Sequence, residues 1–202
     1  LLREREAVEY RSALARQIVE LQELIRAVDN LVTLCAPPEA RRARHGERFD
    51  LAAEIGLRLR GEEERARRAN VALVRLLPPS LSLRGDRESL MLALRNLVAN
   101  ALDWSPAGGR VEVRIGSDER GVHIQVDDQG PGVPEAERTR IFLPFERGPA
   151  RPDGRVGYGL GLALVRTVVE LHQGTVRVTT SPLGGASFRL EIPHPPGEAL
   201  RE

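Results

Sequence analysis

The stretch that decides the fold is LMLALRNLVANALDWSP, residues 90–106 of a 202-residue chain. Its apolar residues recur at helical spacing and Asp86 ahead of it is a good helix cap, so we predict one helix that ends before Pro106. Asn96 and Asn100 are four residues apart and therefore share one face of that helix. Amide oxygens on a helix that lines a cleft suit Mg²⁺, which also keeps waters and phosphate oxygens. Two solvated or capping amides are the alternative interpretation of this pair.

A second stretch, VDDQGPGVP at residues 126–134, also indicates a ligand site. It takes Asp127 and Asp128 from the end of a predicted strand into a turn. A buried carboxylate there needs a hydrogen-bond donor, and the exocyclic amine of adenine is a suitable one. Gly130 and Gly132 would let the backbone approach a base closely. An acidic turn that binds a cation such as Ca²⁺ is the alternative.

A third stretch, GYGLGLAL at residues 157–164, has glycines at every second position ahead of a predicted helix. Free backbone N–H groups and the helix dipole make such a helix start an anion site, although a flexible hinge is the alternative. The spacing differs from GxGxxG, which argues against a Rossmann site. The preceding segment ERGPARPDGRV (146–156) is either an arginine-bearing lid over phosphates or an ordinary surface loop. We expect Phe142 and Phe145 to anchor the base of that loop in the core.

The remaining patterns predict an α+β domain. Helices are expected over 51–69, weakened by Gly56 and Gly61, and over 160–172, ended by Gly174. A short extended piece is expected at Phe49. Strands are expected at 71–77, 81–83, 110–115, 122–126, 175–180 and 186–192, and the last four form two hairpins.

Residues 1–36 predict a separate helical stem. Its apolar residues alternate four and three apart, which is the a/d seam of a coiled-coil-like heptad repeat. A narrow seam favours a partner helix and hence a homodimer, and packing on the chain's own domain is the alternative. Residues 37–47 predict a linker, 48–193 the folded domain, and 194–202 a loose tail. The seam consists of Leu14, Ile18, Leu21, Ile25, Val28, Val32 and Cys35.

Composition argues against several functional classes. The formal net charge is +1, so no strong field indicates a nucleic-acid partner or a membrane contact for this part of the chain. Every one of the 30 Lys-or-Arg positions is arginine, which excludes a P-loop lysine and Schiff-base chemistry. A single cysteine excludes an internal disulfide, and no apolar run is long enough for a membrane helix, so we expect a cytoplasmic protein. Because the sequence starts at Leu1, we expect a fragment, and an anchoring membrane segment could lie upstream.

Taken in order, these motifs resemble the catalytic ATP-binding domain of sensor histidine kinases. That family has the Bergerat ATP fold, shared with gyrase B, MutL and heat-shock chaperone ATPases. NLVANALDWSP (96–106) resembles the N box, DDQGPG (127–132) the first glycine box, IFLPFERG (141–148) the F box and GYGLGLAL the second glycine box. GGASFRLEIP (184–193) is similar to the last strand. The resemblance implies a two-layer α/β sandwich with a mixed sheet and helices on one face.

The resemblance also implies roles for individual residues. It assigns Asn100 to Mg²⁺, Asn96 to the phosphates as the catalytic-motif residue, and Asp128 to the adenine amine. The stem resembles the second helix of the family's dimerisation and phosphotransfer domain. The further ATP-binding residues that it implies are Trp104, Gly130 and Gly132 around the base, and Arg147, Gly157, Gly159, Leu160 and Gly161 around the phosphates.

Two features depart from the family pattern. The N box commonly carries a basic residue three positions after the magnesium asparagine, and here that residue is Asp103, which would repel a triphosphate unless it points away or acts through the metal. The family's acceptor histidine lies on the first stem helix, followed by an acid and a proline, and no such segment is present. The four histidines are His45, His123, His172 and His194, of which His172 matches a structural helix end of the family.

We therefore interpret the chain as the ATP-binding core of a two-component sensor histidine kinase. The enzyme would use ATP and Mg²⁺ to phosphorylate a histidine, which passes the group to an aspartate of a response regulator. One alternative is a degenerate histidine kinase-like scaffold that binds ATP weakly or not at all, favoured by Asp103 and by the missing acceptor. The other is an anti-sigma-type serine kinase, against which the stem argues.

Overall fold

A computed structural model of the protein describes residues 47–146 and 158–194, and in the stem residues 14, 17, 18, 21, 24, 25, 27–33 and 35. Its main sheet is mixed: β2 and β4 run parallel, and the other neighbours are antiparallel. In spatial order the strands are β2 (Ala72–Leu76), β4 (Arg110–Asp118), β5 (Gly121–Asp127), β7 (Ala186–Pro193) and β6 (Thr175–Thr180). A second, two-stranded sheet pairs β1 (Arg48–Asp50) with β3 (Ser82–Arg84). Both predicted hairpins are confirmed.

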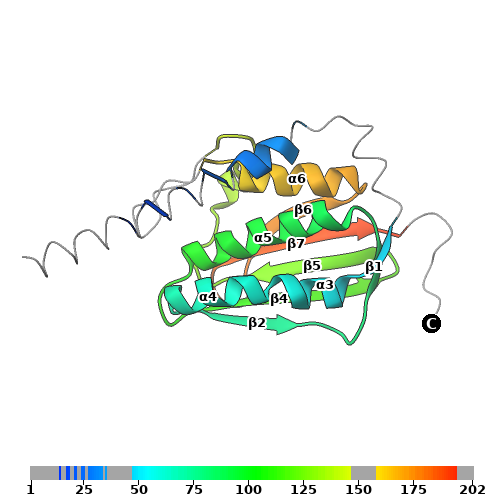
Figure 1. The fold of residues 1–202 in the computed structure, drawn as a ribbon, viewed down its shortest axis with the longest axis horizontal. Coiled ribbons are helices and arrows are strands. Elements are labelled where there is room, and N and C mark those ends of the chain that lie inside the picture. Colours follow the sequence, from blue (N-terminus) through cyan, green and yellow to red (C-terminus); the bar gives the residue numbers. More distant parts are fainter. Residues whose placement is uncertain are drawn as a thin grey trace, which may run out of the picture.

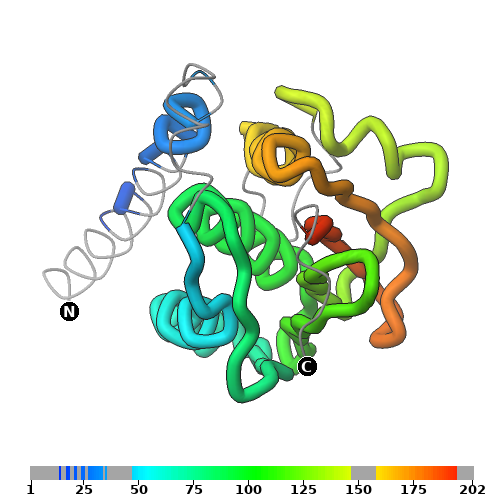
Figure 2. Tube along the Cα trace, turned by 90° about the vertical axis from the view of Figure 1, so that its right-hand side faces the viewer, coloured from blue at the N-terminus to red at the C-terminus, as the bar shows by residue number. Residues whose placement is uncertain are grey.

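The helices of the described domain lie together on one face of the main sheet (Figure 1, and Figure 2 from the side). Two short 3-10 turns, η1 and η2, follow the turn at residues 127–132, which is called the acidic turn below. This arrangement confirms the predicted two-layer α/β sandwich. The helices are α3 (Leu51–Arg58), α4 (Arg60–Ala69), α5 (Arg87–Trp104) and α6 (Gly161–Leu171), and the turns are η1 (Glu135–Glu137) and η2 (Arg140–Phe142).

The core lies between α5, α6 and the helix-facing side of the sheet. On β4 and β5 the apolar residues at alternate positions are all buried, as expected for strands with one face on a core. The strand register places Val113 beside Val126 and Ile115 beside Ile124, so these side chains form one apolar layer. The predicted buried face of α5 is confirmed, and it consists of Leu90, Leu94, Leu97, Val98 and Ala101.

The single helix predicted over 51–69 is wrong in one respect, because the chain forms two helices that meet at Leu59. The amide of Leu59 still donates to the carbonyl of Ile55 at 3.0 Å, which closes α3. The amide of Glu62 then donates back to Leu59 at 3.1 Å, which is a tighter, three-residue turn. This turn lets the Leu59 side chain enter the core, where it is buried. Tertiary packing therefore divides what the local pattern joins.

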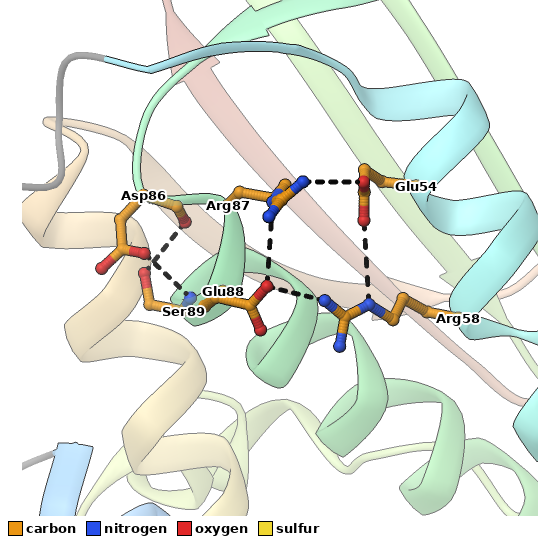
Figure 3. A network of polar contacts seen from close by, with 6 residues as sticks. All are labelled: Glu54, Arg58, Asp86, Arg87, Glu88 and Ser89. Atoms are coloured by element: carbon orange, nitrogen blue, oxygen red, sulfur yellow. Dashed lines mark hydrogen bonds and ion pairs between the residues drawn. The ribbon is translucent and has the colours of Figure 1, made fainter.

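Polar contacts fix α3 against the start of α5 (Figure 3). The side chain of Asp86 caps α5 as predicted. Beside it, Arg87 contacts Glu54 at 3.2 Å and Arg58 contacts Glu88 at 2.7 Å. Exposed ion pairs are individually weak, but these four charges form one network that links two helices. The network sets the position of α5, which carries the asparagine pair.

The described stem residues are helical, and Asp29 and Asn30 contact Arg95 and Asn96 of α5. Among the stem residues that the structure describes, Ala27 and Asn30 are buried. The described apolar residues of the predicted seam, in contrast, are 53–65% exposed, and Cys35 is exposed as well. Packing of the seam on the chain's own domain is therefore the wrong alternative for these residues. The boundaries of the stem, linker and tail stay predictions, because residues 36–46 and 195–202 lie outside the described residues.

Candidate functional site

The predicted anion site lies where α5 meets the start of α6. A methyl group at Gly161 would lie only 2.8 Å from Oδ1 of Asn96, so glycine is what allows α6 to approach this asparagine. Leu160, the buried N-cap residue of α6, makes no side-chain cap hydrogen bond. The first N–H groups of a helix lack partners within the helix, so this helix start can accept an anion. The structure thus brings together three of the residues predicted to contact phosphates.

The predicted adenine site is built around Asp128, which is 3% exposed. Its Oδ1 accepts hydrogen bonds from the amides of Gly130 at 2.8 Å and Ala186 at 2.9 Å. No described residue donates to Oδ2. Burial raises the pKa of Asp128 above its ordinary value, the two amides oppose that shift, and the neighbouring charge of Asp127 adds to it. One oxygen is therefore fixed by the backbone and the other remains able to accept a hydrogen bond.

Gly185 is a site residue for which the sequence predicted no role. A methyl group at this position would lie 2.2 Å from Oδ1 of Asp128 and 2.5 Å from the amide nitrogen of Gly130. These two atoms are joined by the hydrogen bond between Gly130 and Asp128, so relief of the clash would displace one or both of them. Glycine is therefore required where the β6–β7 turn crosses the acidic turn. The signal was present in GGASFRLEIP, which contains Gly185 and Ala186.

Trp104, Gly130 and Gly132 lie around the same turn. A methyl group at Gly130 would lie 3.0 Å from the carbonyl oxygen of Trp104, so the acidic turn packs closely on the end of α5. Gly132 has φ +75°, a left-handed conformation that favours glycine. The adenine side of the candidate site is thus bordered by the last turn of α5.

One helix connects the two ends of the site. Trp104 stands two turns beyond Asn96, about 12 Å along the axis of an α-helix. Asn100 lies between them and is half-buried, and no described residue hydrogen-bonds to its side chain. Its amide oxygen is a ligand type that Mg²⁺ accepts together with waters and phosphate oxygens, so the residue fits that ion. Within the described residues there is no group of three His, Cys, Asp or Glu side chains that could hold a metal without a nucleotide.

The two phenylalanines of IFLPFERG (141–148) have different positions. Phe142 is buried and makes an edge contact with the ring of Phe188, with centroids 6.3 Å apart, as predicted for a core anchor. Phe145 is 67% exposed with φ +64°, so its predicted place in the core is wrong. Its amide donates to the carbonyl of Gly159 at 2.9 Å, which joins the two ends of the proposed lid. Arg147 and Gly157 lie outside the described residues.

Comparison with known proteins identifies the family and the fold. Residues 85–196 match the family described as histidine kinase-, DNA gyrase B-, and HSP90-like ATPase. The chain belongs to this family. It is a histidine kinase ATPase domain homologous to two-component sensor kinases. The matched region includes α5, the acidic turn and both glycine motifs.

Individual relatives agree with this assignment. Sensor histidine kinase CpxA of Escherichia coli K12 is 42% identical over 117 residues, which are 57% of this chain and 25% of CpxA. The structure of the mycobacterial sensor histidine kinase MprB is similar with a TM-score of 0.63 at 33% identity, over 73% of this chain and 97% of MprB. Full-length ShkA, solved in complex with AMPPNP, has a TM-score of 0.65 at 25% identity, over 86% of this chain and 36% of ShkA. The chain thus spans about a quarter of CpxA.

Asp103 of this kinase domain, which departs from the family pattern, has a partner on α4. Its Oδ1 lies 2.6 Å from Nη2 of Arg65, and the two side chains are 6% and 20% exposed. The carboxylate is thus offset by a cation from the neighbouring helix. The presence of Asp103 is therefore not by itself evidence against a triphosphate site.

Proposed function

We propose that this ATPase domain binds ATP with Mg²⁺ and transfers the γ-phosphoryl group to a histidine, for relay to a response-regulator aspartate. The observation that carries the proposal is the placement of an adenine-type acceptor against the last turn of α5 and of a helix N-terminus beside Asn96, two turns earlier on the same helix. Asp128 is the acceptor and Gly161 begins the second helix. The names of the relatives, all sensor kinases, and the AMPPNP bound to ShkA support it.

Each residue would act on a different part of the nucleotide. Oδ2 of Asp128 accepts from the adenine amine, and Trp104 and Gly132 border the base. Asn96 and the first amides of α6 hold the phosphates in place, which is most of the catalysis that phosphoryl transfer needs. Asn100 holds Mg²⁺, and the ion, when bound, neutralises charge on the phosphate oxygens. Arg147 of the lid, together with Gly157, Gly159 and Leu160, completes the phosphate end.

The acceptor histidine is proposed to lie elsewhere in the whole protein. Within the described residues, His172 is buried between helices and His123 lies on a strand, so neither is placed for transfer. His45 lies outside the described residues. The exposed seam of the stem would join two copies of the protein, as a dimerisation helix does. A response regulator and a cytoplasmic setting complete the proposal. Among the described residues no helix is long and apolar enough to cross a membrane.

Calorimetric titration with a non-hydrolysable ATP analogue, with and without Mg²⁺, tests the nucleotide site. We expect Mg²⁺-dependent binding that weakens at least tenfold in Asp128→Asn, because the amide presents a donor as well as an acceptor to the adenine amine. Asp127→Asn is the matched control. Its carboxylate bonds to Gln125 on the opposite face of the sheet, so the affinity should hold. No binding at millimolar analogue would overturn the proposal.

Labelling of the full-length protein with γ-labelled ATP tests the reaction. We expect a phosphoryl group that is lost in acid and kept in base, as for phosphohistidine. An acid-stable label would instead indicate a hydroxyl acceptor, as a serine kinase would use. Nucleotide binding without any label would favour the non-catalytic scaffold.

A further inference from the structure

Asn30 of the stem and Asn96 of α5 form a reciprocal amide pair. Nδ2 of Asn30 donates to Oδ1 of Asn96 at 3.1 Å, and Nδ2 of Asn96 donates to Oδ1 of Asn30 at 3.1 Å. Asn30 is 5% exposed. The two residues are 66 positions apart in the sequence, so the pair is a tertiary contact. It joins the stem directly to a residue of the proposed phosphate site.

The pair uses most of the hydrogen-bonding capacity of Asn96. One N–H of its amide donates to Asn30 and the other to the carbonyl of Leu92 at 2.9 Å. An amide group has only two such donors, so neither is left for a further acceptor. A phosphate oxygen at the start of α6 can receive a hydrogen bond from Asn96 only after one of these two bonds is broken, and the bond to Asn30 is the one that links the stem to the domain.

Neighbouring contacts hold the stem in the same place. Ala27, three residues before Asn30 and therefore on the same helix face, is buried against the domain. Asp29 and Arg95 form an ion pair at 3.6 Å with both side chains about half exposed. Such a pair adds little, so the buried amides are the main specific contact. The stem seam lies on another face of the helix and stays exposed.

We propose that the Asn30–Asn96 pair is an intramolecular latch that makes stem docking and triphosphate binding mutually exclusive. The proposal rests on the proposed function and deepens it by assigning a regulator to the same site. A triphosphate that recruits Asn96 releases the stem. Linkage makes this coupling reciprocal: the factor by which nucleotide binding weakens stem docking is also the factor by which undocking of the stem increases nucleotide affinity.

The expected size follows from the two hydrogen bonds. Two net neutral bonds change the docking equilibrium by roughly tenfold, and the apparent Kd varies inversely with the competent fraction. Asn30→Ala should therefore lower the apparent Kd for a magnesium-bound ATP analogue about fivefold to tenfold, measured by calorimetry. Alanine favours a helix, so the stem stays helical in this variant. Gln17→Ala, which removes an exposed amide of the stem outside the seam, is the matched control and should leave the Kd unchanged.

The chain contains one tryptophan and one cysteine, which allows the docking itself to be measured. Energy transfer from Trp104 to a fluorophore on the exposed Cys35 reports the position of the stem. We expect transfer to fall when the analogue is added to the wild type, and to be low from the start in Asn30→Ala. Unlabelled protein corrects for any direct effect of the nucleotide on Trp104 emission.

The outcomes separate this proposal from the proposed function. Equal affinities in wild type and Asn30→Ala, or transfer that stays constant on nucleotide binding, would overturn the latch and leave the kinase assignment intact. Failure of both proteins to bind nucleotide would overturn both proposals. Tighter binding by Asn30→Ala together with lower transfer would support the latch.

Discussion

The backbone amide of Asp86 donates a 2.9 Å hydrogen bond to Nε2 of His172, across 86 residues of sequence. The other ring nitrogen, Nδ1, lies 2.7 Å from the carbonyl of Val168 and therefore carries the proton. The ring is buried, and a methyl group at Gly85 would lie 2.7 Å from it. His172 thus joins the start of α5 to the end of α6. This confirms the structural role predicted for it and fixes the two helices that carry Asn96 and Gly161.

Replacement of this histidine should therefore cost stability. His172→Ala leaves the buried amide of Asp86 without its acceptor, and we expect the free energy of unfolding to fall by about 1–3 kcal/mol in a urea titration. His194→Ala is the control. That ring is not buried, and its hydrogen bond within the described residues is to the carbonyl of Asp118, so a change within about 0.5 kcal/mol is expected. Equal losses in the two variants would contradict the assigned role.

The Arg65–Asp103 contact yields a second prediction. Arg65→Ala removes the cation beside a nearly buried carboxylate, and we expect a loss of about 1–3 kcal/mol in the free energy of unfolding. Asp103→Lys restores the basic residue typical of the family but places it against Arg65, so it should also destabilise. A double variant with Arg65→Glu and Asp103→Lys should recover part of the loss. Additive effects in this double-mutant cycle would show that the two side chains do not interact.

Substitution of Gly185 should affect nucleotide binding more than any other change in the β6–β7 turn. In Gly185→Ala the new methyl group displaces Asp128 or Gly130, so we expect at least a tenfold loss of affinity for the ATP analogue. Gly56→Ala is the contrasting variant. Nothing lies within 4 Å of a methyl group at that helical position, so we expect about 0.5–1 kcal/mol of added stability and unchanged affinity. Unchanged affinity in Gly185→Ala would contradict the proposed geometry of the adenine site.

The raised pKa of Asp128 predicts two opposite dependences on pH. Nucleotide affinity needs the charged carboxylate, so it should fall as the pH is lowered through this pKa, which lies above the ordinary value of 3.8. Stability of the nucleotide-free domain should change in the other direction. An acid whose folded pKa is raised contributes its full stability below the unfolded pKa and loses it as the pH rises through the folded pKa.

Asp128→Asn should remove both dependences on pH. Calorimetry measures the nucleotide affinity and urea titration the stability, each at pH values between the unfolded and the folded pKa of Asp128. Asp50→Asn is a control of opposite sign, because a hydrogen bond from Ser80 lowers the pKa of Asp50. The contribution of Asp50 is present above the ordinary value and is lost as the pH falls through the lowered pKa. Asparagine is as good an N-cap residue as aspartate, so α3 and the fold should persist in Asp50→Asn.

Local patterns predicted most elements of the domain. The Asp86 cap, the end of α5 at Trp104 and the end of α6 before Gly174 all agree with the structure. Caps, glycine ends and alternating strands depend on neighbours within a few residues, and such signals are readable in the sequence. Most of the candidate site residues could be proposed for the same reason, because each lies in a short contiguous motif.

Contacts between distant segments could not be predicted in this way. Nothing near Asp103 in the sequence indicates that Arg65 lies beside it, and no motif contains Asn30. Phe145 was misplaced because hydrophobicity predicts burial, while the hydrogen bond to Gly159 holds its backbone in a left-handed conformation with the ring outside. Burial of a particular side chain depends on the whole fold, whereas a motif specifies only its own segment.

The strand order leaves β2 and β6 at the two edges of the main sheet, where unpaired backbone groups invite edge-to-edge aggregation. Each edge carries a charged arginine: Arg75 on β2 pairs with Glu63 at 2.6 Å, and Arg177 on β6 lies 3.7 Å from Glu191. Such charges oppose the addition of a further strand. Sheet extension is thus a poor route to self-association for this domain, and contacts between copies at high concentration should favour helices over strands.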